Sequence, residues 1–220
     1  MLGRPRSGGH RSSRKAYHAG LWETVTVARW PTMAAMNANP ARPRVYLAGP
    51  DVFFPDSREV FERLRALCAR LGLEGVEPSD GGLAESGAQG ASDDELAQRI
   101  YAGNVRLIQA CDGVVANLCA FRGLEPDSGT VFEVGYAVAL GKPVVGYGVA
   151  PGSYAERVGA ALPCARADDG QLREAGSGAM VEGLGQRLNL MLTRSTPLAD
   201  SAEAALQRLA QQLRSRTAGR

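Results

Sequence analysis

Short apolar segments alternate with amphipathic segments from residue 42 almost to the end of the chain. Apolar runs that end near glycine or proline predict buried strands at 45–50, 113–118 and 143–147, and residues 73–78 could form a further strand. Apolar residues spaced three and four apart predict helices at about 57–71, 93–110, 129–140 and 202–213. Because strands that are apolar on both faces alternate with helices, the pattern predicts an α/β protein with a parallel sheet covered on each side.

The segments between these elements indicate where a functional site would lie. Residues 79–93 are rich in Gly and Ser and predict a loop that could act as a lid, and residues 150–187 read as irregular. In a parallel sheet, the functional groups gather at the carboxyl ends of the strands. We therefore expect the site among three loops, which begin at residues 49, 118 and 148.

The first 41 residues differ from the rest of the chain. They are rich in Gly, Ser and Arg, lack a sustained period, and up to residue 40 carry six basic residues against the single acidic Glu23. We predict a disordered basic extension over 1–41, or a segment upstream of the true start codon, since Met33 and Met36 lie near its end. A targeting or nucleic-acid-binding arm is a third interpretation. Residues 42–215 are predicted to form a single domain, whose net acidic charge argues against nucleic acid as its partner.

Composition and motifs exclude several kinds of chemistry. The two histidines, His10 and His18, both lie in the extension, so the domain lacks the residue that a Ser-His-Asp triad requires and zinc sites favour. No GxGxxG, P-loop or HExxH motif occurs, and four cysteines without a CxxC pair predict free thiols in a reducing, cytoplasmic setting. No apolar run reaches the length of about 18 residues that a membrane span needs. We expect neither metal nor cofactor, which leaves carboxylates and hydroxyls as the candidate catalytic groups.

The densest group of candidate residues lies between 121 and 137. Asp127 or Ser128 can cap the helix that follows, which places Glu133 in its first or second turn. There the helix dipole favours an ionised carboxylate, which is suited to nucleophilic attack on an electron-poor carbon. Ordinary helix electrostatics without a catalytic role is the alternative interpretation, although the apolar residues on both sides of Glu133 favour a buried, functional group.

Three further positions carry open alternatives. In the loop at 49–56, two prolines fix the backbone, and Phe53 could stack on a flat ligand or fill an apolar gap. Tyr46 is either a core residue or a hydroxyl aimed at a carboxylate. Asn104 reads as a surface amide or a group of the site.

Five segments between residues 45 and 192 together resemble one protein family. They are YLAGPDVF (46–53), NVRLIxxCD (104–112), ANLCAFRG (116–123), PDSGTVFEVGYAVALGKPVVGY (126–147) and NLML (189–192). This combination resembles the nucleoside 2-deoxyribosyltransferases, whose relatives include the deoxynucleoside 5′-monophosphate N-glycosidases. The resemblance implies a flavodoxin-like, doubly wound parallel sheet and a homodimer or larger homo-oligomer. It also implies a role in nucleotide salvage, by transfer of 2-deoxyribose between nucleobases through a covalent deoxyribosyl-glutamate ester without a cofactor.

The resemblance also assigns roles to individual residues. Glu133 matches the nucleophile that attacks C1′, Asp127 the acid that helps to protonate the leaving base, and Tyr46 the tyrosine that orients the nucleophile. Asn189 resembles an asparagine that a neighbouring subunit lends to the sugar hydroxyls, and Asn104 stands where many members carry an aspartate. The other residues assigned to substrate binding are Gly49, Asp51, Phe53, Arg122, Gly129 and Met191.

The chemistry of the two carboxyl groups agrees with this assignment. Retaining glycosidases cleave a comparable bond with one carboxylate as nucleophile and a second carboxyl group as acid. We expect Glu133 to stay ionised while Asp127 holds the proton. Two other readings remain: a hydrolase of the same scaffold acting on deoxynucleosides or their 5′-monophosphates, and a ligand-sensing module without turnover.

Overall fold

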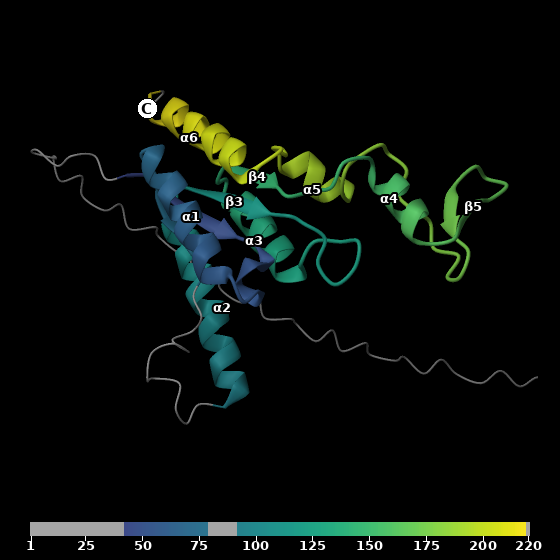
Figure 1. Cartoon of the computed structure of the whole chain (residues 1–220), viewed down its shortest axis with the longest axis horizontal. Helices are drawn as coiled ribbons and strands as arrows, with labels where there is room; N and C mark the ends of the chain where they lie inside the picture. Colours follow the sequence, from purple (N-terminus) through teal and green to yellow (C-terminus); the bar gives the residue numbers. More distant parts are fainter. Residues whose placement is uncertain (1–41, 79–91, 219–220) are drawn as a thin grey trace, which may run out of the picture. The chain divides into compact units, whose positions relative to one another are not determined.

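A four-stranded parallel sheet organises the chain in the computed structural model, which describes residues 42–78 and 92–218 (Figure 1). The strands β1 (Arg44–Ala48), β2 (Glu74–Val76), β3 (Gly113–Asn117) and β4 (Val144–Tyr147) lie in the order β2-β1-β3-β4. All three pairings are parallel, and a single parallel bridge from Gly146 to Leu198 occupies the position of the fifth strand in a flavodoxin-like sheet. The predicted fold class is therefore confirmed. The predicted extension at 1–41 and residues 79–91 of the predicted loop lie outside the described residues.

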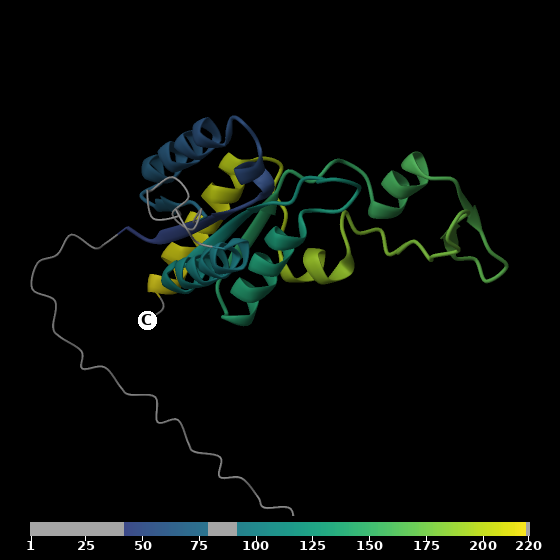
Figure 2. The same cartoon turned by 90° about the horizontal axis from the view of Figure 1, so that it is seen from below.

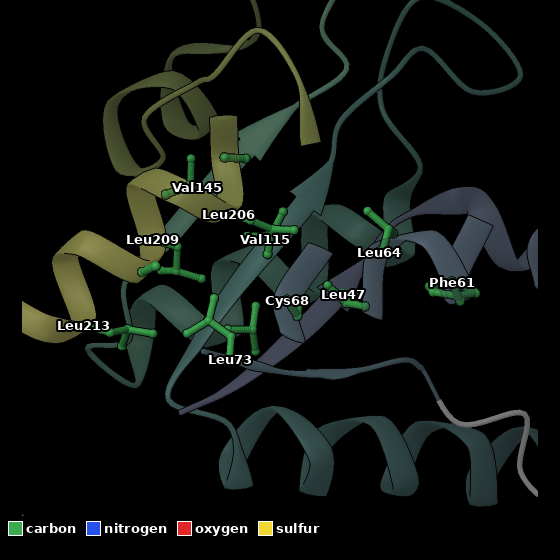
Figure 3. Packing of buried hydrophobic residues seen from close by; sticks show 13 residues of the cluster. Leu47, Phe61, Leu64, Cys68, Leu73, Val115, Val145, Leu206, Leu209 and Leu213 are labelled. Carbon is green, nitrogen blue, oxygen red and sulfur yellow. The ribbon is translucent and has the colours of Figure 1, made fainter. Parts of the chain in front are cut away.

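Helices cover both faces of this sheet. Helices α1 (Ser57–Arg70) and α6 (Ala202–Ala218) pack on one face, while α2 (Asp93–Ala110) and α3 (Ser128–Ala139) pack on the other (Figure 2). Because side chains alternate along a strand, Val45 and Leu47 of β1 join the core under α1 and α6. Figure 3 shows Leu47 in this core. Tyr46 and Ala48 point to the opposite face and join the core under α2 and α3. The alternation thus places the Tyr46 side chain on the same face as helix α3.

The helix boundaries follow from local capping. Ser92 and Glu95 form a reciprocal capping box at the start of α2, and Asp127 caps α3 through its side chain. Helix α1 begins after Asp56, although the side chain of Asp56 makes no capping bond, and the chain leaves this helix through Gly72 at a φ of 76°. Helix α6 continues to Ala218, five residues beyond the predicted end. The prediction ended early because residues 214–217 are exposed and carry no apolar pattern.

The region from 150 to 187 is more regular than predicted. A capping box of Ser153 and Glu156 begins helix α4 (Tyr154–Ala161), and strands β5 (Cys164–Arg166) and β6 (Leu172–Glu174) pair antiparallel. A 3₁₀ helix, η1 (Pro50–Phe53), and a short helix α5 (Leu190–Ser195) were also not predicted. These elements were missed because each spans eight residues or fewer, too short for a periodic signal. None of the helices in the described ranges is long and apolar enough to span a membrane.

Candidate active site

A tyrosine–glutamate pair lies between the sheet and helix α3. The hydroxyl of Tyr46 donates a hydrogen bond to Oε1 of Glu133 over 2.5 Å, across 87 positions of sequence. Tyr46 is fully buried in strand β1, and Glu133 is partly buried beside the face of α3 that packs on the sheet. Burial and the negative charge of Glu133 raise the pKa of Tyr46 well above its ordinary value. Tyr46 therefore remains a hydrogen-bond donor and fixes one carboxylate oxygen of Glu133.

Burial also governs the protonation of Glu133. Loss of solvent raises the pKa of Glu133 to about 7, the hydrogen bond from Tyr46 lowers it, and the neighbouring Asp127 raises it. The helix dipole is expected from the sequence to favour the ionised form of Glu133, and burial, which has the largest effect on the pKa, acts in the opposite direction. Glu133 is the sixth residue of α3, beyond the first four residues that have free N–H groups, so the helix dipole has little effect there. Near pH 7 the side chain exists in both protonation states.

Asp127 occupies the N-cap position of α3. Its Oδ2 accepts hydrogen bonds from the backbone N–H of Thr130 over 2.8 Å and from the Thr130 hydroxyl over 3.0 Å. The sequence left open whether Asp127 or Ser128 caps the helix, and the structure selects Asp127. This cap fixes the carboxyl group one and a half turns before Glu133, where its charge acts on that residue.

Both carboxyl groups line a cavity of about 400 Å³. It lies at the carboxyl end of the sheet, where a parallel α/β fold places its ligands. Of the residues assigned to substrate binding or catalysis from sequence, the cavity contains Gly49, Phe53, Asn104, Asp127, Gly129 and Glu133. The walls also contain four residues that sequence reasoning did not assign, namely Val52, Pro78, Ile100 and Thr130. No sequence motif marks such lining positions, although the N-cap spacing from Asp127 could have indicated Thr130.

The remaining predicted site residues lie outside this cavity. The amide of Asn117 holds the carboxylate of Asp51, and the guanidinium of Arg122 lies over the rings of Phe121 and Phe53, 4.8 and 5.8 Å from their centres. Arg122 is also the one described non-glycine residue with a positive φ, 52°. Arg122 thus contacts the cavity wall through Phe53, whereas Asp51 supports the same loop from behind.

Asn189 and Met191 line a second cavity, of about 490 Å³, on the other side of α3. The side chain of Asn189 caps helix α5 by accepting from Met191 N–H, and its amide donates to Glu182 over 3.1 Å. Met191 is 72% exposed. The structure therefore does not bring either residue into the Glu133 cavity of the same chain.

Comparison with known proteins places this geometry in context. Residues 45–191 match the family model described as nucleoside 2-deoxyribosyltransferase, which is about two thirds of the chain. The chain belongs to the nucleoside 2-deoxyribosyltransferase family. The matched deoxyribosyltransferase region contains Tyr46, Glu133 and all the residues that line the 400 Å³ cavity.

Three individual proteins illustrate how far the likeness extends. A structure described as 2-desoxiribosyltransferase from Leishmania mexicana is 33% identical, with a TM-score of 0.59, over 77% of this chain and 97% of that one. A conserved protein from Enterococcus faecalis V583 is 21% identical, with a TM-score of 0.50, over 78% and 99% of the two chains, and shares the fold alone. An uncharacterized protein of Schizosaccharomyces pombe is 40% identical over 119 residues, 53% of this chain and 54% of its own length. The chain thus spans about half the length of that curated relative.

Within residues 42–78 and 92–218, no three His, Cys, Asp or Glu side chains are grouped so that they could hold an ion. The side chains at the Glu133 cavity that can exchange protons or donate hydrogen bonds are carboxyl, hydroxyl and amide groups.

The Tyr46–Glu133 hydrogen bond predicts a pH effect. Because this bond lowers the pKa of Glu133, a Tyr46→Phe variant should have a higher Glu133 pKa. Activity that needs the carboxylate should then rise at higher pH than in the wild type, with kcat/KM at pH 7 reduced about tenfold. A profile of kcat/KM from pH 5 to 9 measures the shift. An unchanged profile would show that Tyr46 serves only as a core residue.

Proposed function

We propose that this chain transfers the 2-deoxyribosyl group of a deoxynucleoside to a free nucleobase through a covalent ester on Glu133. One observation carries the proposal: a buried tyrosine hydroxyl fixes one oxygen of Glu133 while the same carboxyl group lines a cavity with Asp127. Membership of the deoxyribosyltransferase family supports this reading.

The proposed reaction has two steps that mirror each other. In the first, a Glu133 oxygen bonds to C1′, the bond from C1′ to the base nitrogen breaks, and its electron pair leaves with the base. Asp127 delivers a proton to that base as the bond breaks. In the second step, a nitrogen of the acceptor base bonds to C1′, the ester bond breaks, and its electron pair returns to Glu133. The proton of the acceptor base passes to Asp127, which restores the starting state.

The charge of the cavity favours an unphosphorylated nucleoside as donor. Two carboxyl groups line the cavity, and its described lining residues include no Lys or Arg. A 5′-phosphate dianion would therefore be repelled.

A donor competition experiment tests this proposal. Purified protein is incubated with 2′-deoxyinosine or its 5′-monophosphate, with and without adenine, and the products are separated by chromatography. We expect 2′-deoxyadenosine to form faster than free deoxyribose, and the nucleoside to react at least about tenfold faster than the monophosphate. Release of free sugar at the same rate with or without adenine would identify a hydrolase instead. Binding of the nucleoside without any product would identify a ligand-sensing module.

The second cavity bears on the assembly of the enzyme. Asn189 caps α5 and the exposed Met191 lies on it, and neither residue lines the Glu133 cavity of its own chain. We propose a homo-oligomer in which this α5 segment completes the site of a neighbouring copy, with Asn189 contacting the sugar hydroxyls. A cytoplasmic role in nucleotide salvage is consistent with this activity.

A further inference from the structure

The carboxyl ends of three strands meet around the side chain of Asn117, the last residue of β3. Its amide Nδ2 donates to Oδ1 and Oδ2 of Asp51 over 3.1 and 3.0 Å. Its Oδ1 accepts from the backbone N–H of Cys119 over 3.3 Å. A backbone N–H can only donate and a carboxylate can only accept, so both ends of the amide are fixed in one orientation. We call this arrangement of Asn117, Asp51 and the Cys119 N–H the Asn117 clamp.

Two glycines let the neighbouring loops close on the clamp. A Cβ atom at Gly49, after β1, would lie 2.9 Å from Asn117 Cβ and closer still to Asp51 Oδ2. A Cβ atom at Gly148, after β4, would overlap Asn117 Oδ1, and the φ of this glycine is 82°. Both approaches are closer than carbon–carbon or carbon–oxygen contacts allow. The loops after β1, β3 and β4 therefore converge on this single amide.

The clamp holds the wall of the Glu133 cavity from behind. Gly49, Val52 and Phe53 line that cavity, whereas Asp51, which lies between them on η1, turns its carboxylate to Asn117. Pro50 is the buried residue of η1, whereas Phe53 is 59% exposed, so burial anchors only the first residue of the turn.

The loop after β3 is held by the same amide and supports the same wall. Cys119 N–H binds Asn117, and two residues later Phe121 stacks on Phe53 with ring centres 5.3 Å apart. Asn117 therefore sets the position of η1 and of the Phe121 loop together.

We infer that Asn117 is a positioning residue for substrate binding, which acts through Asp51 to fix the η1 wall opposite Glu133. The kinetic part of this inference rests on the proposed function. Because the wall contacts a bound substrate and not the reacting bond, its displacement should weaken binding of the ground state and the transition state alike. Loss of the clamp should therefore raise KM and leave kcat nearly unchanged.

A reciprocal exchange of the two side chains tests the inference. Asn117→Asp places two carboxylates in contact and should raise KM about tenfold, with kcat changed less than about threefold. Asp51→Asn keeps an acceptor for Asn117 and should have a smaller effect.

The double variant Asp51→Asn/Asn117→Asp restores a donor that faces a carboxylate. The carboxylate introduced at position 117 can still accept the hydrogen bond from Cys119 N–H, so KM should return to within about threefold of the wild type. Gln211→Glu, on the exposed side of α6, adds the same charge elsewhere and should change nothing.

Hydrogen–deuterium exchange of peptides covering residues 49–56 measures how firmly the clamp holds this segment, and the measurement does not depend on enzyme activity. Exchange should rise in Asn117→Asp and return toward the wild-type rate in the double variant. Wild-type kinetics and exchange in Asn117→Asp, or a double variant as impaired as the single one, would overturn the inference. If the wild type lacks transferase activity, the proposed function fails, and the exchange pattern still decides whether the clamp fixes η1.

Discussion

Replacing Glu133 by alanine is expected to reduce deoxyribosyl transfer by about 10⁴-fold or more, because the variant loses the atom that forms the ester. Glu133→Gln should be almost as inactive, although its amide oxygen can still accept the hydrogen bond from Tyr46. The glutamine variant therefore separates loss of the nucleophile from loss of the Tyr46 contact. Formation of 2′-deoxyadenosine from 2′-deoxyinosine and adenine provides the measurement.

A matched control and a trapping experiment complete this test. Glu62 forms an exposed ion pair with Arg58 on α1, so Glu62→Ala removes a carboxylate outside the cavity and should leave transfer unchanged. A 2′-fluoro-2′-deoxyarabinosyl donor destabilises positive charge at C1′ and should slow the breakdown of the ester. Mass spectrometry should then find the added sugar on the peptide that contains Glu133. Transfer by Glu133→Ala at the wild-type rate would remove the proposed mechanism.

Much of the fold was predictable because long periodic segments carry its information. The strands β1, β3 and β4 and the helices α1, α2, α3 and α6 each produce an apolar repeat or a buried run, whereas the edge strand β2 is short and only partly buried. The boundaries of these elements were predicted to within a few residues, apart from the longer C-terminal end of α6. The β5–β6 hairpin is different, because its three-residue strands contain no buried residue and carry no such repeat. Its existence depends on pairing with a partner strand and not on a local pattern.

The candidate site was predictable in its residues and not in its electrostatics. The family resemblance paired the side chains of Tyr46 and Glu133, whereas the local pattern around Tyr46 fitted a core residue equally well; the structure shows the hydrogen bond between them. The pKa of Glu133 depends on how many atoms surround the carboxyl group after folding, which no spacing in the sequence encodes. The position of Asp51 shows the same limit. Its motif indicates the correct loop, while the direction of its carboxylate follows from Asn117, a residue 66 positions away.

The elevated pKa of Glu133 has a consequence for the proposed reaction cycle. With the pKa near 7, the carboxyl group can be neutral or ionised at ordinary pH, and the hydrogen bond from Tyr46 favours the ionised form that attacks. Asp127 acts in the opposite direction, since its negative charge makes the ionised form of Glu133 less favourable. A proton on Asp127 would therefore both prepare the acid for the leaving base and favour the ionised nucleophile.

Replacing Asp127 by asparagine is expected to reduce kcat with 2′-deoxyadenosine as the donor by about 10²- to 10⁴-fold, because the variant cannot deliver a proton to the leaving base. Asparagine caps helices as well as aspartate does, so the hydrogen bond to Thr130 N–H and helix α3 should persist. Thermal unfolding of the variant should stay close to that of the wild type. A large loss of stability would instead assign Asp127 to the cap alone.

A donor whose base leaves without protonation distinguishes loss of the Asp127 acid from displacement of helix α3. The base of 7-methyl-2′-deoxyguanosine already carries a positive charge and departs without a further proton, so Asp127→Asn should cleave this donor within about tenfold of the wild-type rate. The pH profile gives an independent reading, because Asp127 raises the pKa of Glu133 and its neutral replacement should shift the rise in activity to lower pH. Tyr46→Phe shifts the same rise to higher pH, so the two variants should move the profile in opposite directions. Equal losses with both donors, or shifts of the same sign, would mean that Asp127 does not act as the acid beside Glu133.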